Sequence, residues 1–171
     1  GYLPLTNPIS VTINAGNVTT RNVDNEIIKG NVKLFKIDDR LTTFLKGAEF
    51  ELFKMKPVID EETGDETGEY EEVSMGKYTT DDKGVIYIED LEYGQYYFIE
   101  TKPPYGFEIT DHGRKYHFSI EDPGATVNIT AENTEIFGRV EVEKSGDDGK
   151  LLEGAEFTVK DSSGKVVDVF T

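Results

Sequence analysis

Three polar side chains lie on strand faces that are otherwise apolar, and their chemical types can react with one another. Each of them, Lys36, Glu100 and Asn133, is the last residue on the apolar face of an expected strand. The apolar members of the three faces are Val32 and Leu34, then Tyr96 and Phe98, then Val127, Ile129 and Ala131. Because burying any one of the polar groups alone would be costly, we expect the three to meet inside the protein.

The chemistry open to this group is amide formation within the chain. In a water-poor core an amine loses its proton more readily and a carboxyl group holds its proton more tightly. A neutral Lys36 amine could attack the Asn133 carboxamide, while a protonated Glu100 polarises its carbonyl and passes a proton to the leaving ammonia. This happens once per molecule, so we expect self-cross-linking and not an enzyme with turnover. The residues alone also allow a buried Lys36–Glu100 ion pair beside a hydrogen-bonded Asn133.

The elements that must position these residues are strands. Alternation with period two recurs from residue 30 to residue 137, for example at Ala48, Phe50 and Leu52, and no amphipathic helix is evident. The run "DDKG" at residues 81–84, followed by apolar residues 85–88, indicates a hairpin turn. The fold class we predict is all-β, an antiparallel β-sandwich of two packed sheets.

An internal repeat divides the chain into three parts. "GNVKLFK" at residues 30–36 matches "GRVEVEK" at residues 138–144, and "LKGAEFELF" matches "LEGAEFTVK". Asn133 lies 108 positions after Asn25, as Lys144 does after Lys36. We therefore predict that residues 1–29 are the last strands of a preceding repeat, residues 30–137 a complete domain, and residues 138–171 the first strands of a following repeat.

Composition excludes several classes of partner and chemistry. The net charge of −16 at pH 7 disfavours binding to nucleic acid and to anionic membranes. There is no cysteine, so disulfides and thiolate chemistry are absent, and no apolar run is long enough to span a membrane. "LPLT" at residues 3–6 only faintly resembles a sortase sorting signal.

No metal or cofactor site is predicted. The acidic stretch at residues 59–73 lacks the ligand order of a calcium-binding EF-hand loop, and we interpret it as a solvated, hairpin-like loop. His112 and His117 are the chain's two histidines, and they have no nucleophile motif or carboxylate at metal-ligand spacing beside them.

The strand sequences resemble the Cna-B-type domains, also described as SpaA-like or prealbumin-like, of Gram-positive surface proteins and pilins. The resemblance covers residues 30–136, and its most specific segment is "FIETKPPYGF" at residues 98–107, which is similar to the family's E-box. Pro103 and Phe107 stand where alanine and tyrosine are usual. Residues 138–171 resemble the first third of another such domain.

The resemblance implies an isopeptide bond between Lys36 and Asn133, assisted by Glu100 as the E-box acid. It implies that Asn25 and Lys144 are half-sites whose partners belong to neighbouring repeats, so neither flanking segment should cross-link by itself. The implied function is a structural stalk or backbone module of a cell-wall-anchored adhesin or pilus, outside a Gram-positive cell. The implied partners are neighbouring repeats of the parent chain.

Two further interactions remain open from the sequence. The exposed strand edges of the two flanking segments could pair head to tail between copies of the chain. Alternatively, the domain could bind host matrix or glycan, because tyrosines such as Tyr70, Tyr93 and Tyr105 could stack on a ligand.

Overall fold

The computed structural model describes residues 1–171 and contains ten β-strands and no α-helix. No element could therefore cross a membrane as a helix. The chain forms two compact units, Gly1–Ile136 and Phe137–Thr171. The strands are β1 (Lys29–Asp38), β2 (Glu49–Ile59), β3 (Glu66–Thr79), β4 (Val85–Glu92), β5 (Gly94–Lys102), β6 (Phe107–Glu108), β7 (Lys115–Ile120), β8 (Thr126–Glu135), β9 (Phe157–Lys160) and β10 (Val166–Phe170).

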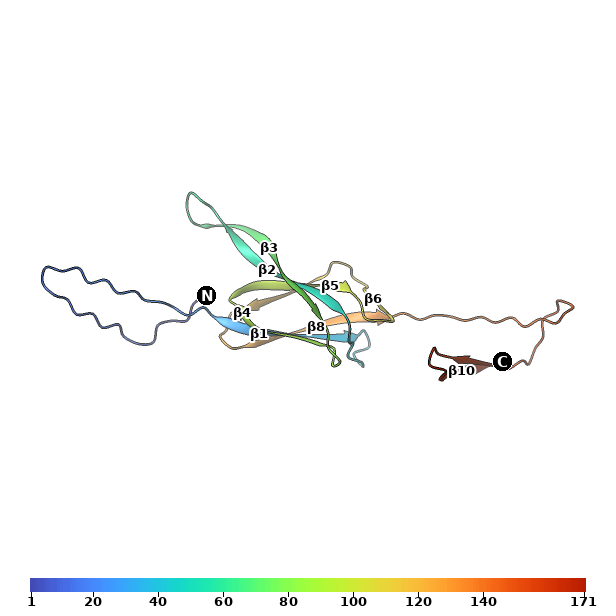
Figure 1. The fold of residues 1–171 in the computed structure, drawn as a ribbon. Coiled ribbons are helices and arrows are strands. Elements are labelled where there is room, and N and C mark those ends of the chain that lie inside the picture. The colour runs from blue at the N-terminus through green and yellow to red at the C-terminus, as the bar shows by residue number, and fades with distance from the viewer. The chain divides into compact units, whose positions relative to one another are not determined.

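The first unit contains two four-stranded sheets, and the predicted all-β sandwich is confirmed (Figure 1). One sheet has the order β4-β1-β8-β6, here called the β1 sheet, and the other has the order β3-β2-β5-β7, here called the β5 sheet. All the pairings are antiparallel except that of β1 with β8, which is parallel. The first and last long strands of the domain are therefore direct neighbours that run in the same direction.

The core lies between the two sheets and is rich in aromatic rings. Phe98 stacks on Phe118 with 5.6 Å between ring centroids, and Phe118 stacks on Tyr96 at 5.3 Å. Such pairs contribute about 0.5–1.5 kcal/mol each beyond the burial of their area. The Tyr96 hydroxyl donates to the Glu92 carbonyl at 2.7 Å, so its burial leaves no unpaired donor. The other fully or nearly buried apolar residues of this core are Val32, Leu34, Ala48, Phe50, Leu52, Ile86, Leu91, Ile120 and Ala131.

A turn is present at residues 81–84 as predicted, but it is not a hairpin turn, because it joins β3 of the β5 sheet to β4 of the β1 sheet. It helps to position Lys36. Gly84 has a φ of +69°, and a Cβ there would lie 2.8 Å from the Lys36 carbonyl oxygen, so only glycine fits. This close approach lets the Lys36 backbone N–H donate to the Gly84 carbonyl at 2.8 Å.

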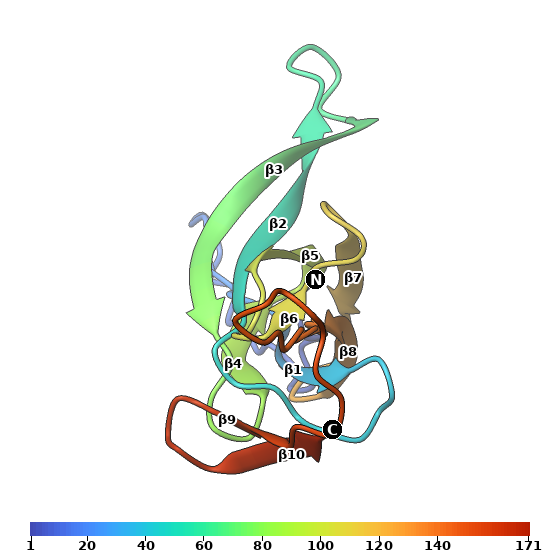
Figure 2. The same ribbon diagram turned by 90° about the vertical axis from the view of Figure 1, so that its right-hand side faces the viewer.

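The acidic stretch at residues 59–73 is exposed and lies in a hairpin, as predicted, but half of it is strand and not loop. Only residues 60–65 form a turn, and Glu66 onward belongs to β3, which pairs with β2 in a long hairpin that extends beyond the sandwich (Figure 2). Lys56 lies opposite Glu71, and Glu72 pairs with Lys115, so neighbouring positive charges offset the repulsion between carboxylates.

The two flanking segments contain little regular structure. Residues 1–28 form no strand of their own, and an isolated bridge between Tyr2 and Ile27 pairs the two ends of this segment with each other. The segment meets the sandwich where the Tyr93 N–H donates to the Ile28 carbonyl. In the second unit β9 and β10 form a hairpin in which Phe157 stacks on Phe170. This unit begins one residue before the predicted boundary at residue 138. The assignment of both segments to neighbouring repeats stays a prediction.

Candidate functional site

The structure brings the three predicted site residues together between the sheets. Lys36 of β1 lies opposite Ala131 of β8 in the parallel ladder, and Asp38 lies opposite Asn133. Lys36 and Asn133 are therefore on adjacent strands, two positions apart along the same inward face. Glu100 comes from β5 in the facing sheet. Their exposed fractions are 0% for Lys36, 6% for Glu100 and 1% for Asn133, so all three are removed from water.

Glu100 contacts both of the other side chains through one oxygen. The Asn133 Nδ2 donates to Glu100 Oε2 at 3.1 Å, and Lys36 Nζ lies 4.0 Å from the same oxygen. The Lys36 amine also donates to the Ala131 carbonyl oxygen at 3.3 Å. The carboxyl group thus lies where it can exchange a proton with the amine and with the carboxamide.

Hydrogen bonding around the site is incomplete. Lys36 makes one hydrogen bond, whereas an ammonium group carries three donors. Glu100 Oε1 and Asn133 Oδ1 are buried without any partner. Unpaired buried polar atoms cost about 1–3 kcal/mol each, so they destabilise the unreacted site. A reaction among the three side chains that removed this cost would be favoured.

Burial brings the pKa values of Lys36 and Glu100 closer together. It lowers the pKa of Lys36 from 10.5 to about 8, against the attraction of Glu100 and Glu132. It raises the pKa of Glu100 from 4.5 to about 7, although Lys36 and the Asn133 hydrogen bond act in the opposite direction. Both shifts lower the free energy needed to move the proton from the ammonium group to the carboxylate. A neutral amine beside a neutral carboxylic acid is therefore readily accessible.

Sequence reasoning missed Asp38, a second buried acid next to the site. Asp38 is 1% exposed, and its carboxylate accepts bonds from the Thr42 N–H at 2.6 Å, the Thr42 hydroxyl at 2.6 Å and the Thr43 N–H at 2.9 Å. The Thr42 hydroxyl is the largest of the causes that lower the pKa of Asp38. Asp38 is thus a fixed anion that shapes the turn after β1. An aspartate followed by threonines at short spacing was the available signal.

Other residues singled out in the sequence do not join this site. Asn25 and Lys144 are exposed, and the structure brings neither into a buried cluster. His117 lies on β7 with its ring 5.4 Å from that of Tyr97, and no group of three or more metal-ligating side chains is assembled. Tyr70 and Tyr93 line a common groove, whereas Tyr105 lies elsewhere.

A comparison with protein families gives a match that covers most of the sandwich. The SpaA prealbumin-like fold domain matches residues 30–135. The chain belongs to this family. No curated protein sequence matches the chain.

Solved structures similar to the chain come from Gram-positive bacteria. The TIE protein of Bacillus anthracis has a TM-score of 0.67 and 29% identity, over 86% of this chain and 25% of that one. A streptococcal ancillary pilin has a TM-score of 0.47 and 27% identity, over 74% of this chain and 35% of that one. The major pilin SpaD of Corynebacterium diphtheriae has a TM-score of 0.47 and 23% identity, over 63% of this chain and 30% of that one. This SpaA-family chain thus spans about a quarter to a third of the length of these proteins.

Proposed function

We propose that this chain is a structural module of a Gram-positive surface protein or pilus, and that a Lys36–Asn133 isopeptide bond locks its sandwich. The observation that carries the proposal is the meeting of an amine, a carboxyl group and a carboxamide in one buried site, with 4.0 Å and 3.1 Å separating Glu100 Oε2 from its two neighbours. Membership of the SpaA family supports the architecture. Attachment to the cell wall and exposure at the cell surface are part of the proposal.

The reaction begins with a proton transfer from Lys36 to Glu100. The neutral Nζ then attacks Cγ of Asn133, and a tetrahedral intermediate forms in which Nδ2 has become basic. Glu100 Oε2, already within hydrogen-bond distance of Nδ2, gives it the proton. The Cγ–Nδ2 bond breaks, ammonia leaves, and the second proton of Nζ returns to Glu100. The carboxyl group ends protonated, and an amide joins Lys36 to Asn133.

The same acid can also polarise the carboxamide carbonyl. Asn133 Oδ1 has no hydrogen-bond donor in the structure. A half-turn of the carboxamide exchanges Oδ1 and Nδ2, which would let a protonated Glu100 donate to the carbonyl oxygen. Rotation of the Asn133 carboxamide alone would therefore let Glu100 act both on the carbonyl oxygen and on the leaving nitrogen.

A small cavity beside Asn133 offers the ammonia a place to go. Its volume is about 70 Å³, and Tyr116, Arg114 and Asp39 are among the residues that line it with Asn133. A water-sized molecule takes up about 30 Å³ in the liquid, so ammonia fits. The leaving group can thus move away from the new bond without an opening of the sandwich.

The position of the bond explains why such a module would benefit from it. Because β1 and β8 are parallel neighbours, the chain enters the sandwich beside the start of β8 and leaves it at the opposite end (Figure 1). A pulling force would load the β1–β8 ladder in shear. A Lys36–Asn133 bond would carry that force from β1 directly to β8 and leave residues 37–132 unloaded.

The mass of the intact protein tests the proposal. The folded protein should be lighter than its sequence mass by one ammonia, about 17 Da. Lys36→Ala, Glu100→Ala and Asn133→Ala should each restore the full mass. Full mass in the folded unsubstituted protein would rule the bond out and leave a plain β-sandwich with a buried ion pair.

A further inference from the structure

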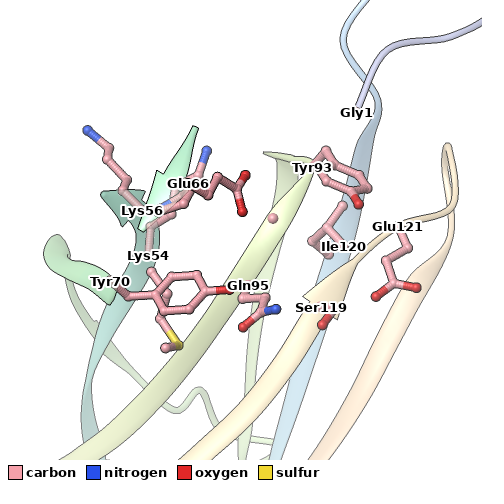
Figure 3. A pocket seen from close by; sticks show the side chains of 13 residues that line it. Gly1, Lys54, Lys56, Glu66, Tyr70, Tyr93, Gln95, Ser119, Ile120 and Glu121 are labelled. Atoms are coloured by element: carbon pink, nitrogen blue, oxygen red, sulfur yellow. The ribbon is translucent and has the colours of Figure 1, made fainter. Parts of the chain in front are cut away.

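We propose that a groove at the end of the β5 sheet is a binding site for a neutral oligosaccharide. The groove has a volume of about 500 Å³ and lies where the β2–β3 hairpin extends past the ends of β5 and β7 (Figure 3). This volume falls within the range of small-molecule sites in proteins, roughly 300–1,000 Å³. The groove contains none of the three cross-linking residues, so the inference does not depend on the isopeptide bond.

Two exposed tyrosines border the groove from different elements. Tyr70 comes from β3 and is 42% exposed, and Tyr93 lies between β4 and β5 and is 45% exposed. Both are held by backbone pairing: Tyr70 lies opposite Pro57 of β2, and the Tyr93 N–H donates to the Ile28 carbonyl at 2.8 Å. The faces of such rings pack against the C–H faces of sugars, and the phenol hydroxyls can bond sugar hydroxyls.

Uncommitted polar side chains lie between the two tyrosines. Figure 3 shows Tyr70 pointing toward Gln95, with Ser119 next to Gln95 and Tyr93 on the far side. Gln95 and Ser119 are direct cross-strand partners on β5 and β7, and neither side chain is used in a hydrogen bond within the protein. An amide and a hydroxyl offer both donors and acceptors, which is what a sugar with several hydroxyls requires.

The charged side chains that line the groove are balanced in number and sign, and this favours an uncharged ligand. Lys54 and Lys56 are matched by Glu66 and Glu121, although the whole chain carries −16. Lys54 is already paired with Glu92 at 3.0 Å. A polyanion would meet too little positive charge here, and the rest of the surface would repel it. A neutral sugar chain has neither cost.

The experiment is a glycan array that contains neutral, sialylated and sulfated oligosaccharides, followed by titration of the best neutral binder. Tyr70→Ala and Tyr93→Ala should each weaken that binding at least about tenfold. Tyr105→Ala is the matched control, because Tyr105 is fully exposed at 103% and lies outside the groove, and it should leave affinity within about twofold. Thermal melting confirms that each variant is folded.

Three results would overturn the proposal: no neutral oligosaccharide is bound, only acidic ones are bound, or the two groove variants bind as tightly as the unsubstituted protein. The mass deficit expected from the isopeptide bond is measured on the same samples. A folded protein that has lost ammonia but binds no glycan would overturn this inference alone.

Discussion

Replacing Lys36 with methionine removes the nucleophile while keeping an unbranched side chain of similar length. Lys36 is fully buried, so an apolar replacement needs no contact with water. The residue left unpaired is Glu100. Because burial raises the pKa of Glu100 to about 7, that carboxyl group is neutral at pH 5 and costs little there. Stability measured at pH 5 therefore reports mainly the loss of the cross-link.

The expected size of the effect follows from the length of the closed loop. The loop from Lys36 to Asn133 contains 98 residues, both ends included. Closing a loop of this size restricts the unfolded chain by about 5 kcal/mol at 25 °C. For a domain of about a hundred residues, that corresponds to a melting temperature lower by about 20 °C in Lys36→Met.

The assay is urea denaturation at pH 5 with thermal melting beside it. Lys33→Met is the matched control: Lys33 lies on the same strand, but its Nζ packs 5.1 Å from the Phe35 ring centroid and is not part of the site. It should keep both the mass deficit and nearly all of the stability. Lys36→Met should also show a steeper dependence on urea, because its unfolded state exposes more surface than a cross-linked one. A stability loss below about 1 kcal/mol, in a protein whose parent has lost ammonia, would refute the loop-closure reasoning.

Four further predictions concern the acid, the ladder and the response to force. Glu100→Gln keeps the shape of the site but cannot exchange a proton, so the folded protein should retain its ammonia; a normal deficit by mass spectrometry would show that the acid is dispensable. In Asn133→Ala the site stays unlinked, and folded Glu100, with its pKa raised from 4.5 to about 7, binds a proton that the unfolded chain releases. The free energy of unfolding should therefore fall by about 2 kcal/mol as pH rises from 5 to 7, relative to Asn133→Ala/Glu100→Gln. Parallel urea titrations measure this difference, and a rise would contradict the assignment. Ala131→Leu places bulk opposite Lys36 in the ladder and should slow ammonia loss after refolding, as followed by mass against time; an unchanged rate would mean that the small side chain is irrelevant. In force spectroscopy, residues 37–132 of the unsubstituted protein should not extend, because the bond bypasses them. In Glu100→Gln, unfolding should lengthen the chain by about 330 Å. Equal extensions of the two proteins would show that no covalent bond carries the force.

The strand faces could be predicted from the sequence because alternation has a direct physical cause. Val32, Leu34 and Lys36 face the core together since side chains alternate along a strand, and the structure places all three at 0% exposure. The same reasoning placed Glu100 and Asn133 inside. The turn at residues 81–84 was equally predictable, since a glycine with positive φ is required there. The hairpin predicted from it was wrong, because the turn carries the chain from one sheet to the other.

The order and direction of the strands could not be predicted in this way. Alternation says which face is buried, but it does not say that β1 pairs with β8 or that the pair is parallel. That pairing brings Lys36 within two positions of Asn133 across the ladder. The resemblance to a family implied that the two react, whereas the composition of either strand did not.

Charge was also a poor guide to local order. The run of glutamates around Glu71 and Glu72 suggested a solvated loop, yet both residues belong to β3. The lysines that offset them, Lys56 and Lys115, come from two other strands, one of them far along the sequence. Asp38 was missed although the threonines that follow it were a signal, because its burial depends on bonds from the Thr42 hydroxyl and two backbone N–H groups that form only in the folded turn.

The Lys36–Asn133 bond itself can be identified by protease digestion followed by tandem mass spectrometry. We expect one branched peptide in which the segments that contain Lys36 and Asn133 are joined through an amide, with one ammonia missing. Recovery of these two segments only as separate linear peptides of full mass, from folded protein, would contradict it.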